Sequence, residues 1–472
     1  MLVRVPRIEA PPAAYRPTRQ YASALIARNW LATVDPGAVG ATRSVTAATR
    51  EPLIEPPVME AASTLGFVLT GGQSWWLPRL LSTLLWAATA LVVFALGRRL
   101  SGATMGLIAA AVVMLDPATT EAARSFQPEA LLLLVTASAA LALVRLEVEA
   151  VSRRRTIVAG LWIGIAVAIK VNAALLLLPL AVLVVERIGR TPQGRRAVRT
   201  IALLAAVPAT LYYGYGLAVG GFLADQTGGR FLPALWLDGA YWRGWIRMTG
   251  AVVPGWLVLA AIAGTVAAAP RVRRTIQGLG AGYVLLGLAF TWHISTHTYY
   301  SLPLLLPVAL GAGAGGAWLL ERAPAPWAHR AGWACLALVA LTGATQELTI
   351  ARHAPSERQQ PAILAAREIG AVLPDGATAA LLAPDYGSLA EFYGDMAARA
   401  WPYAFDLQYA AIQGERPIST SARLSSLERD GVRWFVVTDL AELERQPQLR
   451  SALNKMPLLR SGPGWRIYRL RP

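Results

Sequence analysis

Charged residues are scarce in this chain: they make up 15% of its 472 residues, whereas a soluble protein carries about 25%. Lysine is nearly absent, because the 44 basic residues include only Lys170 and Lys455, and the rest are arginines. Cysteine occurs once, at Cys335 in an apolar run. That excludes a disulfide framework or a cysteine metal site within one chain and favours a buried, inert thiol. With 55% hydrophobic residues, the composition predicts an integral membrane protein.

The sequence contains many long apolar runs, which are candidate membrane spans. A helix needs roughly 17–25 apolar residues to cross a bilayer core, and ten candidate spans approach that length. They are Pro78–Leu96, Thr104–Ala118, Glu129–Val144, Ile157–Ile169, Ala173–Val185, Ile201–Ala218, Ala251–Ala269, Gly278–Trp292, Leu302–Leu320 and Ala331–Thr345. The fourth and fifth are expected to be joined by a tight turn at Lys170–Asn172. Reading them as one span would reverse the orientation of every later helix.

The arginines alternate between loops, and this alternation gives the spans a direction. Short cytoplasmic loops carry an excess of basic residues. Clusters such as Arg153–Arg155 and Arg271–Arg274 lie in alternate loops, and the loops between them are poorer in arginine. The net charge of +16 is therefore explained by topology, and no nucleic-acid partner is expected.

This direction predicts three parts in a multi-pass protein of the inner (plasma) membrane. Residues 1–76 form an extracytoplasmic first loop, residues 77–346 a transmembrane domain of about ten helices, and residues 347–472 an extracytoplasmic α/β domain. An N-terminus outside the cytoplasm requires a preceding helix. Because Met1–Ala14 is not the apolar core of a signal peptide, we expect that a first helix is missing.

Several ionisable residues lie at the outer ends of the spans, where charge is costly unless it is paired or used. Glu55 stands in a rigid Glu-Pro-Pro turn before the amphipathic stretch Val58–Leu69. Glu129 opens a helix, where the helix dipole favours a carboxylate, so a plain helix-capping role is an equal alternative. For Lys170, Arg79 and Arg124 the alternative is a side chain that snorkels to the membrane interface.

An aromatic outer loop, Phe222–Arg247, is most simply an interfacial belt. His293 and His297 are four residues apart, a spacing that suits two metal ligands on one helix face. The segment looks like a helix end and offers no third ligand, so no metal site is expected. The sequence calls for no cofactor and leaves the involvement of a divalent cation open.

The order of these motifs resembles a known family over roughly residues 15–320. Glu55-Pro56-Pro57 is similar to a His/Lys-Pro-Pro turn, and Pro78–Ser82 to an Arg-Leu-x-Ser helix start. Arg124–Leu132 falls where the family has an acidic residue before Ala-Leu-Leu, Lys170 matches a lysine between two spans, and Tyr299–Leu304 matches a Tyr-Tyr-x-x-Pro helix start. The chain resembles the GT-C class of membrane glycosyltransferases, in the family 39-like branch of protein O-mannosyltransferases and lipid A aminoarabinose transferases.

The resemblance implies a GT-C-like polytopic α-helical membrane fold and sugar transfer, such as hexosyl or pentosyl transfer, from a polyprenyl-phosphate donor. The acceptor would be an extracytoplasmic lipid, glycan or protein, and membrane lipids would surround the spans. Cations neutralise the phosphate leaving group, and a carboxylate acts as general base for the acceptor hydroxyl. The implied catalytic residues are Glu55 and Glu129. The implied substrate-binding residues are Arg19, Gln20, Arg79, Arg124, Lys170, His297, Tyr299 and Tyr300.

One departure from the family bears on the catalytic base. The family's first outer loop carries an Asp-Glu pair whose Asp is the base, and alignment through Ile26-Ala27-Arg28 puts Arg19-Gln20 at that pair. Glu55 or Glu129 could take over the role. Otherwise the protein has a different acceptor or is inactive.

The last part of the chain changes its pattern after Thr349. Helices are expected at Pro361–Leu373, Ser419–Arg429 and Asp439–Asn454, and strands at Thr378–Leu382, Arg433–Thr438 and Trp465–Leu470. Strands that alternate with helices predict a small α/β soluble domain.

Two other functions stay in competition with the enzyme. A transporter of lipid-linked sugars would show internal repeats and charges deep within its spans, and neither is evident here. A non-catalytic protein that binds lipid-linked sugars belongs with this alternative. The other is a structural membrane partner of another glycosylation protein, which the missing Asp-Glu pair would suit.

Overall fold

The computed structural model describes residues 16–42, 53–116, 119–220, 231–322 and 355–470, together with a few isolated positions. The chain divides into two compact units. The first comprises Met1–Ile8, Leu53–Val58 and Arg79–His353, and the second comprises Glu9–Pro52, Met59–Pro78 and Ala354–Pro472.

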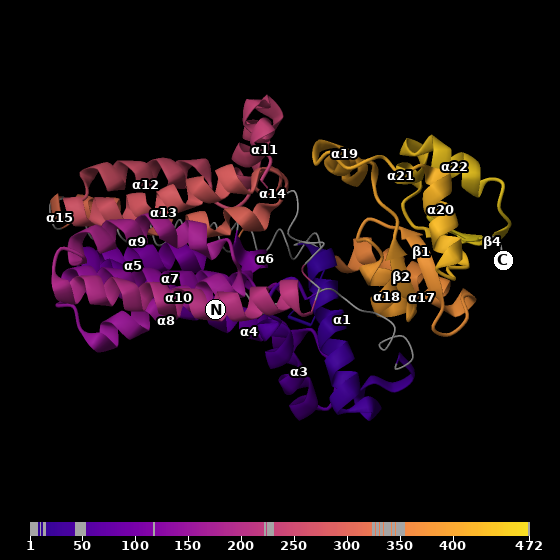
Figure 1. The fold of residues 1–472 in the computed structure, drawn as a ribbon, viewed down its shortest axis with the longest axis horizontal. Coiled ribbons are helices and arrows are strands. Elements are labelled where there is room, and N and C mark those ends of the chain that lie inside the picture. Colours follow the sequence, from indigo (N-terminus) through magenta and orange to yellow (C-terminus); the bar gives the residue numbers. More distant parts are fainter. Residues whose placement is uncertain are drawn as a thin grey trace. The chain divides into compact units, whose positions relative to one another are not determined.

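The first unit is a bundle of helices, drawn in violet to salmon in Figure 1. Its longer helices are α4 (Trp76–Ser101), α5 (Ala103–Leu115), α7 (Glu129–Val148), α8 (Arg153–Ile169), α9 (Ala173–Ile188), α10 (Pro192–Ala218), α11 (Gly239–Gly250), α12 (Gly255–Ala267), α13 (Pro270–Ala289) and α15 (Leu305–Arg322). Nine of the ten predicted spans coincide with these helices. The tenth, Ala331–Thr345, lies almost entirely outside the described residues, as does Cys335.

Four helical stretches among the described residues are long and apolar enough to cross a membrane: α4, α7, α10 and Thr298–Arg322, the last made of η6 (Thr298–Leu304) and α15. The number rises to five if α11 and α12, which meet at 88°, form one broken span. Helices α5, α8 and α9 have 13, 17 and 16 residues. Spans shorter than about 17 residues, such as α5 and α9, are accommodated by a locally thinner bilayer or by flanking side chains that snorkel to the interface.

Leucine side chains cover the outside of this bundle. Leu91 on α4 is 70% exposed, Leu211 on α10 69% and Leu259 on α12 69%. Large exposed apolar surfaces are unfavourable in water, whereas lipid tails solvate them. This outer surface agrees with the membrane location that the composition predicts.

Glycine allows two pairs of helices to pack closely. A Cβ on Gly264 of α12 would lie 2.1 Å from the Gly311 carbonyl oxygen of α15, and one on Gly282 of α13 would lie 2.0 Å from the Leu176 carbonyl oxygen of α9. Any larger residue at these positions would force the helices apart. The high glycine content therefore has a packing role, at these two contacts at least.

The second unit contains a five-stranded sheet in the order β2-β1-β3-β5-β4. Its strands are β1 (Thr378–Leu382), β2 (Ala397–Ala400), β3 (Trp434–Val437), β4 (Leu458–Gly462) and β5 (Trp465–Arg469). β1 runs parallel to β2 and β3, and β5 is antiparallel to β3 and β4. The predicted strands at β1, β3 and β5 are confirmed, and the sequence reading missed β2 and β4.

Helices cover both faces of this sheet, because its strands alternate their side chains between two cores. Ala380 and Phe435 belong to the core that contains Leu424 and Leu449, whereas Leu381 and Val436 belong to the core that contains Ile369. The covering helices are α17 (Pro355–Val372), α18 (Ser388–Gly394), α20 (Thr420–Arg429), α21 (Leu440–Arg445) and α22 (Pro447–Leu453), whereas α19 (Ala404–Ile412) has no buried residue. The small α/β domain is thus confirmed, with the helix expected at Asp439–Asn454 broken at Gln446.

Two α-helices near the start of the chain belong to the same unit as this sheet: α1 (Pro17–Val34) and, from Met59 on, α3 (Val58–Thr70). Arg28 of α1 is buried. It donates from Nε to Gln73 Oε1 at 3.0 Å and from Nη1 to the Phe392 carbonyl at 2.9 Å, and its guanidinium lies 3.8 Å from the centre of the Phe392 ring. Burial lowers the pKa of Arg28 to about 10, against the opposing charge of Asp395. One side chain therefore joins α1, the segment before α4, and α18.

We expect Arg28→Ala to lower the unfolding free energy of the second unit by about 2–4 kcal/mol, since it leaves buried acceptors without their charged donor. Thermal unfolding of the purified protein measures the change. Arg416→Ala, at an exposed position, is the matched loss of one arginine and should stay within about 0.5 kcal/mol of wild type. Equal stability of the two variants would contradict the assigned role of Arg28.

Candidate active site

Lys170 occupies the tight turn between α8 and α9, as the sequence predicts. The turn is closed by hydrogen bonds from the Lys170 backbone N–H to the Ala166 carbonyl, at 3.1 Å, and from the Ala173 N–H to the Lys170 carbonyl, at 2.9 Å. The residue is only 5% exposed. A buried ammonium must be paired, so its neighbours define the chemistry of this end of the bundle.

Two carboxylates hold this ammonium. Lys170 Nζ lies 2.8 Å from Glu129 Oε1 and 3.1 Å from Glu55 Oε1. The Glu129 side chain is 2% exposed and the Glu55 side chain 16%. The other oxygen of Glu129, Oε2, is buried and makes no hydrogen bond within the described part of the chain. With all three groups charged, the triad carries one net negative charge.

Two tyrosine rings lie beside the Lys170 ammonium. Lys170 Nζ lies 4.9 Å from the centre of the Tyr299 ring and 5.4 Å from that of Tyr300, within the range of a cation–π interaction. The His297 ring meets Tyr299 edge-on at 5.4 Å between centres, and its Nδ1 lies 2.7 Å from the Thr296 hydroxyl. The structure thus brings Glu55, Glu129, Lys170 and the Tyr299–Tyr300 pair together, and places His297 beside that pair.

Arg79 and Arg124 lie near one junction of the first unit. The Ser82 hydroxyl, one turn after Arg79 on α4, donates to the Ser125 carbonyl at 2.6 Å, and Ser125 is the neighbour of Arg124. Both arginines are buried, at 7% and 6% exposure. Arg124 forms an ion pair with Glu121 of α6 (Thr120–Ala123). Four residues after Ser125 the chain reaches Glu129, so this loop connects the arginines to the triad.

Two tyrosines that the sequence analysis did not single out position the triad. Tyr212 of α10 donates its hydroxyl to the Leu53 carbonyl at 3.1 Å, next to the Glu55 turn. The Tyr213 hydroxyl accepts from the Val171 N–H at 3.1 Å and lies 3.2 Å from the Ala168 carbonyl, across the Lys170 turn. The signal in the sequence is a Tyr-Tyr pair near the end of an apolar span, where hydroxyls need partners.

Arg19 and Gln20 lie on α1, in the second unit. Gln20 is 3% exposed, and neither residue belongs to the unit that carries Lys170.

His293 and His297 lie with ring centres 5.6 Å apart. No set of three or more histidine, cysteine or acidic side chains suited to a metal ion occurs among the described residues.

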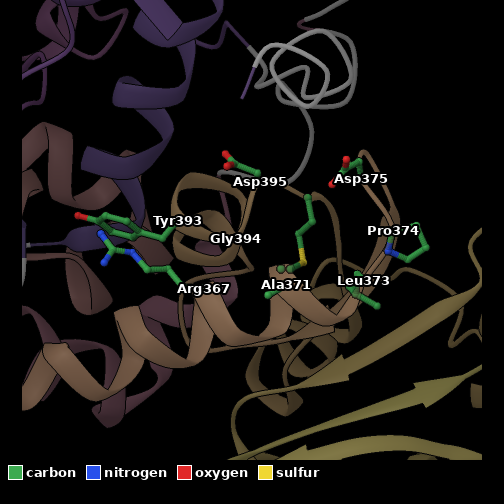
Figure 2. A pocket seen from close by; sticks show the side chains of 10 residues that line it. Arg367, Ala371, Leu373, Pro374, Asp375, Tyr393, Gly394 and Asp395 are labelled. Atoms are coloured by element: carbon green, nitrogen blue, oxygen red, sulfur yellow. The ribbon is translucent and has the colours of Figure 1, made fainter. Parts of the chain in front are cut away.

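The second unit has a cavity of its own, of about 250 Å³, between the end of α17 and the end of α18. Figure 2 shows Arg367 and Tyr393 on one side of it and Asp375 and Asp395 at its rim. Asp395 also lies 3.8 Å from Arg28. Burial raises the pKa of the Asp395 carboxyl, and the charge of Arg28 acts against that rise. The cavity is a separate feature of the sheet domain, and none of the predicted site residues lines it.

Residues 54–217 match the family described as dolichyl-phosphate-mannose-protein mannosyltransferase. The matched segment carries Glu55, Arg79, Arg124, Glu129 and Lys170. No curated protein matches the sequence.

Among solved structures, the chain is similar to ArnT from Cupriavidus metallidurans. The TM-score is 0.61 both for the apo state and for the form bound to undecaprenyl phosphate, at 15% and 16% identity. Each comparison covers 100% of this chain and 96% of ArnT. The resemblance to the GT-C class that the motifs predicted is thereby confirmed, and the fold is shared along the whole chain.

The burial of Lys170 has a direct chemical test, because the chain contains one other lysine. Lys455 is exposed, so an amine-directed reagent should modify it fully in the folded protein and leave Lys170 unmodified. Peptide mass spectrometry measures both sites in one sample. Protein unfolded before labelling is the control in which both lysines react. Equal modification of the two lysines in folded protein would contradict the buried triad.

Proposed function

We propose that this protein transfers a sugar from a polyprenyl-phosphate-linked donor to an acceptor hydroxyl on the extracytoplasmic side of the inner membrane. The observation that carries the proposal is the Lys170 ammonium held between Glu55 and Glu129 beneath two tyrosine rings. Transfer from such a donor needs a cation that binds the phosphate and a carboxylate that accepts the proton of the acceptor hydroxyl. It also needs aromatic rings that contact the sugar. All three occur within this cluster.

Lys170 is the proposed partner of the donor phosphate. When the C1–O bond of the sugar phosphate breaks, negative charge grows on the phosphate oxygens, and a fixed cation stabilises it. In the state described, two carboxylates share the lysine, so an incoming phosphate would displace one of them. Arg79 and Arg124 are the proposed additional cations, since Arg124 lies in the loop that leads to Glu129 and Arg79 lies one turn from the Ser82–Ser125 hydrogen bond.

Glu55 is the proposed general base. Its side chain is the more exposed of the two carboxylates, and displacement from Lys170 by the donor phosphate would free it for the acceptor. The acceptor hydroxyl gives its proton to Glu55, its oxygen forms the new bond to C1, and polyprenyl phosphate leaves with the electron pair. Glu129, almost fully buried, keeps Lys170 in place in this scheme. The reverse assignment, with Glu129 as base through its free Oε2, is the second candidate.

The likeness to a protein solved with undecaprenyl phosphate supports a polyprenyl-phosphate donor. Tyr299, Tyr300 and His297 are the proposed contacts of the sugar, since aromatic rings present flat faces for it. Arg19 and Gln20 on α1 are the proposed contacts of the acceptor or donor from the first outer loop. The exposed arginines at the other ends of the helices support the orientation that places the triad outside the cytoplasm.

The test is sugar transfer by the purified protein in lipid nanodiscs. Radiolabelled polyprenyl-phosphate sugars, pentosyl and hexosyl, are supplied with membrane extract as the source of acceptor. We expect label to move from the donor to an acceptor and free polyprenyl phosphate to appear in equal amount. The control is the same preparation of Glu55→Gln/Glu129→Gln, which lacks both candidate bases.

A non-catalytic protein that binds lipid-linked sugars is the alternative, and the Arg19-Gln20 pair in place of the family's Asp-Glu favours it. It predicts that donor binds to the nanodiscs and competes with undecaprenyl phosphate, with no label transferred and no polyprenyl phosphate released. That result with every donor tested would replace the enzymatic proposal.

A further inference from the structure

The opposite, arginine-rich ends of the helices contain a second cavity, of about 640 Å³. It lies where α7 and α9 end and where α10 and α13 begin. The residues that line it include Arg187, Arg190 and Arg274, together with Thr191, Leu180 and Leu183. The volume falls within the range of ligand sites in proteins, about 300–1,000 Å³. The cavity is therefore large enough for a lipid headgroup.

Three glutamates also line the cavity, and two of them form ion pairs with arginines. Glu147 pairs with Arg187 at 2.6 Å, and Glu149 pairs with Arg155 at 2.6 Å and also with Arg99. Glu186 is exposed. The lining itself has three arginines and three glutamates, and the ion-pair partners Arg99 and Arg155, which lie outside the lining, bring the net charge of the group to +2.

Two arginines in the lining retain capacity for a ligand. Arg274 Nε is buried and forms no hydrogen bond within the described residues, and its nearest carboxylate oxygen, on Glu147, is 3.9 Å from Nη2. Arg190, two residues after the end of α9, is exposed. A phosphate oxygen accepts such N–H donors strongly and often in pairs, and the N-terminus of α10, which Thr191 caps, adds a favourable dipole.

The walls of the cavity are fixed by contacts among the loops around it. Gln193 Nε2 donates to the Val151 carbonyl at 3.0 Å, and Arg155 Nη1 donates to the Ala150 carbonyl at 2.6 Å. The Thr191 hydroxyl accepts from the Gly194 N–H at 3.0 Å. These bonds tie the loop before α8 to the first turn of α10, so the backbone around the arginines is held by hydrogen bonds.

An apolar strip continues from this cavity along α9. Leu175, Pro179, Leu183 and Glu186 follow one another at helical spacing on one face, and the three apolar members are half-buried. Leu178 and Val182 beside them are 49% and 45% exposed. Gly282 closes the α9–α13 contact, so a chain could not pass between these helices and would lie along the outside of α9.

We propose that this cavity binds the phosphate headgroup of an anionic phospholipid, with its acyl chains along α9. The arginines and the cavity suit a phosphate headgroup, and the apolar strip suits the acyl chains attached to it. A soluble phosphate ester presents the same phosphate to the arginines, but it has no acyl chains that would lie on the apolar strip. The proposal concerns the Arg-rich end of the bundle and is independent of sugar transfer at Lys170.

The experiment is native mass spectrometry of the purified full-length protein with defined lipids. We expect phosphatidylglycerol to bind in preference to the zwitterionic phosphatidylcholine. Each arginine that contacts the headgroup should contribute about 1 kcal/mol, so Arg190→Gln alone should weaken phosphatidylglycerol binding by about fivefold and Arg190→Gln/Arg274→Gln by about 25-fold. Arg195→Gln/Arg199→Gln, which removes two arginines of α10 that do not line the cavity, should bind like wild type.

Glycerol 3-phosphate, added in excess, distinguishes the two sources of phosphate. Undiminished phosphatidylglycerol binding supports a lipid site, whereas full displacement overturns it in favour of a soluble phosphate ester. Equal binding by wild type and Arg190→Gln/Arg274→Gln, or equal losses in the test and control pairs, would overturn the site itself. Arg190 is exposed, so the single variant remains informative if the double variant fails to fold.

Discussion

Glu55→Gln is expected to lower kcat for sugar transfer by about 10²- to 10⁴-fold, the contribution of a positioned general base. The glutamine keeps the shape of the side chain and no longer competes with the donor phosphate for Lys170, so donor binding should not weaken. The loss should therefore appear in kcat at saturating donor. A residue with a purely structural role would instead change donor affinity and stability.

Glu129→Gln and Glu444→Gln complete this comparison. Glu129→Gln removes the buried partner of Lys170, so its transfer defect should be accompanied by weaker donor binding and lower stability. Glu444, with a side chain 59% exposed on the sheet domain, is the neutral control for a glutamate-to-glutamine change. Should Glu129→Gln lose kcat alone while Glu55→Gln retains full activity, the base is Glu129 and the assignment of Glu55 fails.

Lys170→Met is expected to have two effects of different origin. Transfer should fall by about 10²- to 10³-fold, because the leaving phosphate loses a preorganised cation. The unfolding free energy should fall by about 3–5 kcal/mol, because two carboxylates in a largely buried site lose their shared partner. Lys455→Met, at the other lysine of the chain, should leave both quantities unchanged.

A double variant separates these effects. In Lys170→Met/Glu129→Gln the buried carboxylate is neutral, so much of the stability lost in Lys170→Met should return, as expected for residues in contact. Transfer should remain as low as in Lys170→Met. If activity returns together with stability, Lys170 acts by holding the fold and not on the donor phosphate. Thermal unfolding and the nanodisc transfer assay on the same preparations decide the point.

The sequence by itself determined the local features of this protein. Long apolar runs predicted nine of the helices in the bundle, because side chains that face lipid must be apolar whatever their neighbours are. The Lys170–Asn172 turn was readable because a charged residue interrupts two such runs. The strands at Thr378–Leu382 and Trp434–Val437 were readable because both of their faces are buried. β2 escaped notice because it is only four residues long and includes Arg399.

Only the tertiary structure decided which of the outer residues meet. Glu55, Glu129 and Lys170 are far apart in sequence, and each has an ordinary explanation as a turn, a helix cap or an interfacial lysine. Their contact distances arise from the packing of α7 beside α8 and α9, and from Tyr212, which fixes the Glu55 segment. The same holds for Arg28 and Phe392, which stand 364 positions apart. Periodicity in a sequence reports the environment of one element, whereas a site requires the positions of several elements at once.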